Sequence, residues 1–463
     1  MIISDEDISK LIDFHIEWNK SKENDFICFT IRQINSCIEA YSKGEDMYNI
    51  KYNIYGKTHD QLEKFENIIQ KYFKKKDIIL DIPKDFPNCF KTISIQKLFH
   101  QVDFAFNNRS NVIITVKKGC GKTQFALYMA EYYNKKYFNN FEKENIDFMI
   151  CTSETSCSDI IGKQILIKNE ESGLTSIEWK YGFLLEGIKE GKCLVLDNIN
   201  EVPSQVTERA NNLFDLNLNS NEILYFDVPE NPNKLEQKIK IKNTFRLIAT
   251  CDEDKLNNMS PAFLNRFKII YFEDQLINLD LLGFIKHKID ELNKIKNNKD
   301  TNISIPSARF RKRLMNLKSK KNEKENENEK EDLINELNKK IKEDKDKILN
   351  SISILSFFIE SVYIFKSEFK KIKNKIIIDY IYQLINPNCK NIIIDDTIYK
   401  EIEIILEEND NSTNDYNKIN KYFFKSSKEL CSFLINAYSP YIIHMHMRFE
   451  GPTDIGKTAG ACA

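Results

Sequence analysis

The spacing of hydrophobic residues divides the chain into a helical beginning, a central stretch in which strands and helices alternate, and a helical end. From Ile8 to about Lys76 apolar residues recur at mostly helical spacing. From about residue 90 to residue 275 short apolar runs alternate with helix-like segments, which is typical of a parallel sheet covered by helices. Beyond Leu276 the spacing is helical again. The pattern therefore predicts an α/β domain flanked by helical regions.

Five short apolar segments are the candidate strands of that domain. They are Asn111–Val116, Ile146–Cys151, Lys192–Leu196, Phe245–Thr250 and Lys268–Phe272. Helices are expected to begin near Gly121, Ser158, Pro203 and Ser260. The run from Ile223 to Ile241 has two prolines between strand-like segments, so it predicts an inserted hairpin.

The segment from about residue 311 to residue 347 is rich in Lys, Glu and Asn and has few apolar residues. Charged segments of this kind rarely pack against a core, so a solvated helix or an unstructured insertion is expected. A partner-binding tail is the alternative.

Composition narrows the classes of function. Charged residues make up 30% of the 463 residues but cancel to a formal net charge of −1, so no general attraction to nucleic acid or to an anionic membrane is expected. Eleven cysteines are scattered without a Cys-x-x-Cys pair, and the start lacks the basic and apolar regions of a signal peptide. The most apolar stretch, roughly Ile352 to Phe365, is too short to span a bilayer. These features predict an intracellular protein, cytoplasmic or nuclear, with no membrane span.

Two segments have the composition of phosphate-binding P-loops. Residues 116–123 read VKKGCGKT, and residues 451–458 read GPTDIGKT, which matches G-x-x-x-x-G-K-[ST] in full. In such a loop backbone N–H groups point at phosphate oxygens, the lysine reaches the β- and γ-phosphates, and the hydroxyl holds Mg²⁺. The candidate binding residues are Lys118, Gly119, Cys120, Gly121, Lys122 and Thr123 in the first loop, and Gly451, Gly456, Lys457 and Thr458 in the second. Few residues follow the second loop, so we expect it to be incomplete on its own.

Further candidate residues follow the first loop in a fixed order. The apolar run Leu194-Val195-Leu196 ends at Asp197, whose carboxylate is placed to hold Mg²⁺. A later strand ends at Asp252, and Arg266 precedes the last strand. A P-loop, a strand-end carboxylate, a second polar strand end and an arginine in this order are far more specific than a P-loop alone.

In these motifs the chain resembles the AAA+ superfamily and, within it, the dynein-related, midasin-type branch. The resemblance covers about residues 95–275 and includes the segments TSETSCSDIIG (152–162) and WKYGFLLEGIKEGKCLVLDNIN (179–200). It implies a three-layer P-loop sandwich around a parallel five-stranded sheet with strand order 5-1-4-3-2. It also extends outward, because residues 29–34 look like the lid helix of a preceding module, with Arg32 at its sensor-2 position.

The resemblance implies a division of the chain into four parts. Residues 1–82 would be the lid-like end of a preceding module, and residues 90–275 the large AAA+ domain. Residues 276–440 would form a helical lid or insert region, and residues 441–463 the truncated start of a following module.

The resemblance also implies roles for single residues. Lys122 would contact the β- and γ-phosphates of ATP, and Thr123 and Asp197 would hold Mg²⁺. Arg266 would act as an arginine finger toward a neighbouring module, in the same chain or in an oligomer. A surface salt bridge is the alternative for Arg266.

Three positions depart from the family pattern and leave hydrolysis open. Val116 replaces the first glycine of the loop, and a β-branched residue would be strained there if the position needs a positive φ. Asn198 replaces the glutamate that polarises the attacking water, and an amide cannot accept a proton. Asp252 stands where an asparagine is usual. Asp252 therefore either takes over part of the base role, or the module binds nucleotide without turnover, which is the interpretation we favour.

The catalytic candidates are thus Asn198, Asp252 and Arg266. The function expected from the resemblance is a nucleotide-binding module of a midasin- or dynein-like remodelling protein that acts on an unknown protein or assembly. A non-enzymatic scaffold and a part of a mysterin-type AAA+ ubiquitin ligase are the alternatives.

Overall fold

The computed structural model divides into two compact units, Met1–Asn278 and Leu279–Ala463. The residues that it describes are 4–20, 34–35, 37–38, 41, 67–73, 81–87, 89–138, 146–168, 175–214, 225–234, 237–272, 274–276, 278–297, 327–345, 350–386 and 395–401. The second P-loop and Arg32 lie outside these residues. The finer division of the chain at residues 82, 275 and 440 stays a prediction.

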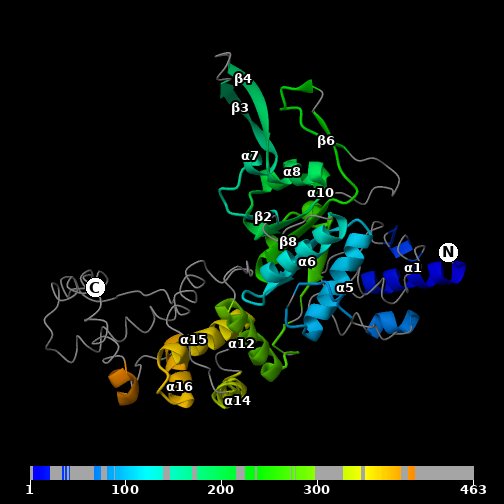
Figure 1. Ribbon diagram of the computed structural model, residues 1–463. Helices are drawn as coiled ribbons and strands as arrows, with labels where there is room; N and C mark the ends of the chain where they lie inside the picture. The colour runs from blue at the N-terminus through cyan, green and yellow to red at the C-terminus, as the bar shows by residue number, and fades with distance from the viewer. Residues whose placement is uncertain are drawn as a thin grey trace, which may run out of the picture. The chain divides into compact units, whose positions relative to one another are not determined.

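A five-stranded parallel sheet forms the centre of the first unit (Figure 1). Its strands, from one edge to the other, are β2 (Phe148–Ile150), β5 (Cys193–Asp197), β8 (Arg246–Asp252), β1 (Asn111–Val116) and β9 (Phe267–Tyr271). All four strand pairs are parallel. Counted along the chain within this sheet, the order is the predicted 5-1-4-3-2, and each strand lies within two residues of its predicted bounds.

Helices cover both faces of the sheet. Successive side chains of β5 show this, because they pack alternately against the helices of one face and of the other. Cys193 and Val195 of β5 pack with α5 (Ile93–Asn107) and α6 (Lys122–Tyr137), whereas Leu194 and Leu196 pack with α8 (Phe183–Glu190). Because neighbouring side chains of a strand point to opposite faces, a strand buried on both sides is expected to be mostly apolar. This explains the short apolar runs in the sequence, and the arrangement confirms the three-layer α/β fold.

Further helices belong to the first unit. They are α1 (Asp5–Lys20), α7 (Cys157–Ile160), α9 (Ser204–Arg209), α10 (Asn211–Phe214), α11 (Pro261–Leu264) and the 3-10 helices η2 (Ile199–Glu201) and η4 (Glu253–Asn258). In α1 the buried residues Leu11, Phe14 and Trp18 follow helical spacing and form a small core with residues of the following segment.

Two antiparallel hairpins extend from the domain near α8 (Figure 1). One pairs β6 (Tyr225–Asp227) with β7 (Lys238–Lys240), which confirms the predicted insertion. The other pairs β3 (Gly162–Lys168) with β4 (Thr175–Tyr181) and was not predicted. The side chain of Gln164 in β3 donates to the backbone oxygen of Glu230, in the loop between β6 and β7, at 2.8 Å. This contact joins the two hairpins.

The described residues of the second unit are mainly helical. They include α12 (Leu281–Asn297), α14 (Glu327–Asp344), α15 (Ile352–Glu368) and α16 (Asn374–Ile385). Lys288 of α12 lies 2.6 Å from a carboxylate oxygen of Glu360 in α15. Both side chains are largely shielded from solvent, so this ion pair contributes to the packing of the two helices.

Helix α14 corrects the expectation for the charged segment. Its residues Leu333, Ile334, Leu337 and Ile341 are buried, so this part of the segment is a packed amphipathic helix. Four apolar residues at helical spacing are sufficient to bury one face of a helix even when the other positions are charged. Within the described residues, no helix is long and apolar enough to cross a membrane.

Asn134 ties α6 to the sheet and provides a test of this packing. Its side-chain oxygen accepts from the backbone N–H of Cys193 at 2.7 Å, and its amide donates to the Cys193 oxygen at 3.1 Å. We expect Asn134→Ala to lower the free energy of unfolding by about 2–4 kcal/mol, because two buried backbone groups lose their partner. Asn107→Ala, at an exposed position of α5, should change it by less than about 0.5 kcal/mol. Equal values from urea unfolding of the two variants would contradict this account.

Candidate functional site

The first P-loop connects the end of β1 to the start of α6. Gly119 and Gly121 have φ values of 81° and 86°, a backbone conformation that glycine adopts without strain. Gly121 immediately precedes the N-terminus of α6, where backbone N–H groups and the helix dipole favour an anion. The backbone of this loop therefore fits a phosphate group, and phosphate binding by the loop stays a prediction.

Val116 does not strain the loop. It is the last residue of β1, lies opposite Asp252 of β8 and is buried. Arg109 and Asn198 are the described non-glycine residues with positive φ, and Val116 is not among them. The condition under which valine would be strained is therefore not met, and a β-branched residue suits this strand position.

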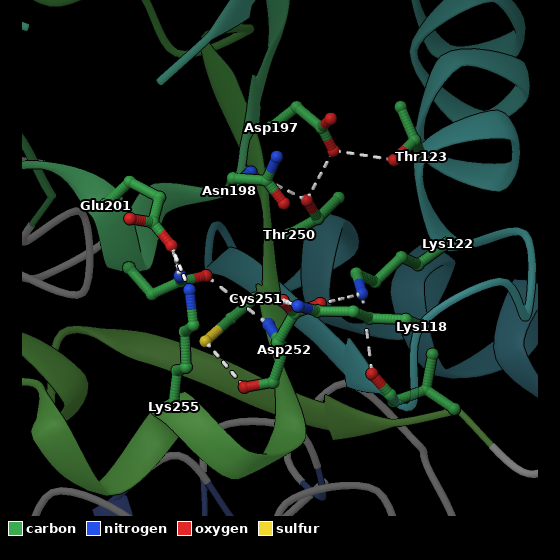
Figure 2. A network of polar contacts seen from close by, with 12 residues as sticks. Lys118, Lys122, Thr123, Asp197, Asn198, Glu201, Thr250, Cys251, Asp252 and Lys255 are labelled. Atoms are coloured by element: carbon green, nitrogen blue, oxygen red, sulfur yellow. Dashed lines mark hydrogen bonds and ion pairs between the residues drawn. The ribbon is translucent and has the colours of Figure 1, made fainter. Parts of the chain in front are cut away.

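Thr123 and Asp197 meet at the carboxyl end of the sheet (Figure 2). The Thr123 hydroxyl donates to Oδ1 of Asp197 at 2.6 Å. The hydroxyl of Thr250, which the sequence did not single out, donates to the same oxygen at 2.6 Å. Hydroxyl and carboxylate oxygens are ligands that Mg²⁺ prefers, so the chemistry of this group fits the expected ion.

Lys122 forms an ion pair with Asp252 across the site. Its Nζ lies 2.5 Å from Oδ1 of Asp252, and it also donates to the Val116 backbone oxygen at 3.4 Å. The two side chains are each 9% exposed. Lys118 contacts the other carboxylate oxygen of Asp252 at 3.5 Å. Two loop lysines thus share one carboxylate at the position where phosphate is expected.

These contacts determine the charge of Asp252. Burial by itself raises the pKa of its carboxyl group, but the hydrogen bond and positive charge of Lys122, with a smaller contribution from Lys118, hold that pKa below its ordinary value. Asp252 is therefore ionised at neutral pH and is a weaker base than an ordinary aspartate.

Asn198 lies in the turn directly after Asp197. Its φ of 58° is in the left-handed region, which asparagine tolerates better than most residues. Its backbone N–H donates to the Thr250 hydroxyl at 3.0 Å. Since β5 and β8 are neighbours, Asn198 directly follows one strand and Asp252 ends the adjacent one, as the predicted strand order requires.

A second set of polar contacts, which the sequence did not indicate, joins η2 to η4. Glu201 forms an ion pair with Lys255, and Asn200 donates to Glu201 at 2.9 Å. The Asn200 side-chain oxygen also accepts from the backbone N–H of Asp252 at 3.3 Å. The only sequence signal for these residues was their closeness to Asp197 and Asp252, since the contacts join segments about 50 residues apart.

Gln275 contacts the P-loop at Cys120. Gln275 is buried and donates to the backbone oxygen of Cys120 at 2.6 Å, a contact with no sequence signal. Burial raises the pKa of the Cys120 thiol, so this side chain stays protonated at neutral pH. Gln275 therefore supports the loop from its buried side.

Arg266 follows α11 and is half-buried. Its guanidinium donates to the backbone oxygen of Ala262, and it makes no ion pair with any residue that the structure describes. The alternative of a surface salt bridge therefore has no support within those residues. Its role toward a neighbouring module stays a prediction.

The site should bind metal only together with a phosphate ligand. Among the described residues there is no group of three or more His, Cys, Asp or Glu side chains that could hold a metal ion. Mg²⁺ is usually held by one or two protein groups plus phosphate oxygens. We expect MgCl₂ alone to leave the thermal unfolding midpoint unchanged, and Mg²⁺ with ATP to raise it by several degrees. A rise with Mg²⁺ alone would contradict the requirement for a phosphate ligand.

The chain is similar to a bacterial protein and to several solved structures. It is 25% identical over 178 residues to the uncharacterized protein YojN of Bacillus subtilis, and the match covers 37% of this chain and about half, 52%, of YojN. A closed-state structure of Hsp104 with ATPγS and casein matches 46% of this chain and 38% of its own at 16% identity, with a TM-score of 0.29. NtrX from Brucella abortus in complex with ATP matches 83% of this chain and 71% of its own at 12% identity, with a TM-score of 0.35. These TM-scores are too low to support any argument about function.

The family comparison is more specific. The model of the AAA domain, dynein-related subfamily, matches residues 111–267. This range begins with β1 and ends at the first residue of β9, so it contains the P-loop, Asp197, Asp252 and Arg266. Residues 111–267 of this chain therefore form an AAA domain of the dynein-related subfamily.

Proposed function

We propose that this domain binds ATP together with Mg²⁺ and turns it over slowly or not at all. The observation that carries the proposal is that, beside the glycine-rich loop and at the carboxyl end of the central strands, Thr123 contacts Asp197 and Lys122 contacts Asp252. Ligands of open α/β sheets bind at this end of the strands. The bound nucleotide would supply the phosphoanhydride bond that is hydrolysed in any turnover, and Mg²⁺ would neutralise part of the charge of its phosphate groups.

The residues of the chain would divide the binding between them. The backbone of Gly119 and Gly121 would hold phosphate oxygens, and Thr123 and Asp197 would hold the metal. Lys122 would exchange Asp252 for a phosphate oxygen, because both are anions that compete for one ammonium group. Lys118 is exposed and would add positive charge at the mouth of the site.

The surroundings of Asn198 and Asp252 argue for weak hydrolysis. An amide at residue 198 can orient water but cannot take its proton. Asp252 is a carboxylate, but its contacts with Lys122 and Lys118 lower its pKa and occupy both of its oxygens. A positioned general base contributes about 10²- to 10⁴-fold to a rate, and neither residue is well suited to the task.

We further propose that the domain works as one module of a larger remodelling protein. Neighbouring AAA+ modules, in the same chain or in an oligomer, would be its partners, with Arg266 directed at the nucleotide of one of them. The remodelled protein or assembly is unknown. A scaffold that holds nucleotide for its structure only is the second candidate, and it is favoured by the replacement of the catalytic glutamate by Asn198.

The first test measures nucleotide binding by a variant at Lys122. We expect Lys122→Ala to weaken binding of a fluorescent ATP analogue by roughly 10- to 150-fold, because a hydrogen bond to a charged group contributes about 1.5–3 kcal/mol. Lys136→Ala, at the exposed end of the same helix, serves as the matched control and should bind like the wild type. If wild type and Lys122→Ala bind equally, the proposed nucleotide site is wrong.

Turnover is tested with Asp252→Asn and Asn198→Glu. If Asp252 mainly holds Lys122, Asp252→Asn should tighten ATP binding by roughly five- to tenfold, since one negative charge beside the phosphates is removed, and should leave phosphate release as low as before. Asn198→Glu should raise phosphate release by at least about tenfold, because it restores a base. Its left-handed backbone should cost about 1–2 kcal/mol of stability, which thermal unfolding would show.

The opposite results would support the base role of Asp252. Loss of a measurable wild-type rate in Asp252→Asn would show that its carboxylate takes part in hydrolysis. Rapid phosphate release by the wild type would exclude both the scaffold and the slow-turnover proposal.

A further inference from the structure

The hydroxyl group of Thr250 connects three parts of the site. Thr250 lies in β8, between the ends of β1 and β5, and is fully buried, with 0% exposure. Its Oγ1 donates to Oδ1 of Asp197 at 2.6 Å and accepts from the backbone N–H of Asn198 at 3.0 Å. Figure 2 shows it lying between these two residues.

The direction of this hydroxyl proton is determined by its two partners. A carboxylate oxygen can only accept and a backbone N–H can only donate, so the single proton of Thr250 must point at Asp197. The same hydroxyl therefore holds one oxygen of Asp197 in place and keeps the following turn closed against β8. Thr123 also donates to Asp197, but Thr123 is itself a proposed metal ligand and Thr250 is not.

We propose that Thr250 is a positioning residue that orients Asp197 for the metal ion held with Thr123. The inference rests on the proposed function, because it assigns a purpose to Thr250 only if Mg²⁺ and nucleotide bind at this site. Without the hydroxyl, Asp197 would lose a strong charge-assisted hydrogen bond and be free to turn away from Thr123. Partners of this kind, which hold a ligand in place, commonly change metal affinity by about 10- to 100-fold.

The adjacent strand supplies a matched control. Thr115 of β1 is also fully buried, and it lies opposite Cys251, the residue after Thr250. Its hydroxyl oxygen has no hydrogen-bond partner among the residues that the structure describes. Thr115→Val therefore makes the same chemical change, at nearly the same depth in the sheet, without removing a hydrogen bond.

The experiment measures binding of a fluorescent ATP analogue to the full chain, with Mg²⁺ and with EDTA. The ratio of the two affinities reports the contribution of the metal and does not depend on hydrolysis. We expect Thr250→Val to reduce this ratio by about tenfold, with little change in EDTA. Thr250→Ser, which keeps the hydroxyl, should restore the ratio, and Thr115→Val should leave it at the wild-type value. If Thr250→Val does not fold, Thr250→Ala removes the hydroxyl without adding a methyl group and is measured in its place.

The possible outcomes separate this inference from the proposed function. A wild type that binds no nucleotide under either condition would overturn the proposed function and this inference with it. A wild type that binds more tightly with Mg²⁺, together with a Thr250→Val variant that has the same ratio, would overturn the inference alone. Equal losses with and without Mg²⁺ would also overturn it, since they would show a role in general packing rather than in orienting Asp197.

Discussion

The site depends on one constraint, which is that β1, β5 and β8 run parallel and end at the same edge of the sheet. The register places Val116 opposite Asp252, and β5 ends beside β8 at Asp197. Charged and polar strand ends that meet in this way must satisfy one another, because unpaired buried charges are costly. The ion pair of Lys122 with Asp252 and the hydroxyl contacts of Asp197 follow from this requirement.

The fold was predictable because its central strands are buried on both faces and are therefore largely apolar. Local signals also placed the P-loop between a strand and a helix, and Asp197 at a strand end, where the structure has them. Thr250 and Gln275 were not predictable in this way, because their contacts depend on which strands become neighbours and in what register. The β3–β4 hairpin did have a signal, the alternation of Ile177, Trp179 and Tyr181, which the charged residues between them obscured. High charge likewise obscured the buried face of α14.

The two replaced residues of the site have different physical consequences. Asn198 removes a proton acceptor but suits the left-handed turn in which it lies. Asp252 introduces a carboxylate that pairs with the lysine expected to bind phosphate, so it acts on binding as well as on chemistry. Under the proposed function, such a site would retain the groups that hold a nucleotide and would lack the group best suited to cleave it. In a protein of several modules, such a site would report whether nucleotide is bound.

The exchange of partners by Lys122 is the central claim of this account. It is tested most directly by an experimental structure of the chain with Mg²⁺ and a nonhydrolysable ATP analogue. The account predicts that Nζ of Lys122 contacts a phosphate oxygen and has left Asp252, while Asp197 keeps its contact with Thr250. An analogue bound elsewhere, with Lys122 still 2.5 Å from Asp252, would contradict it.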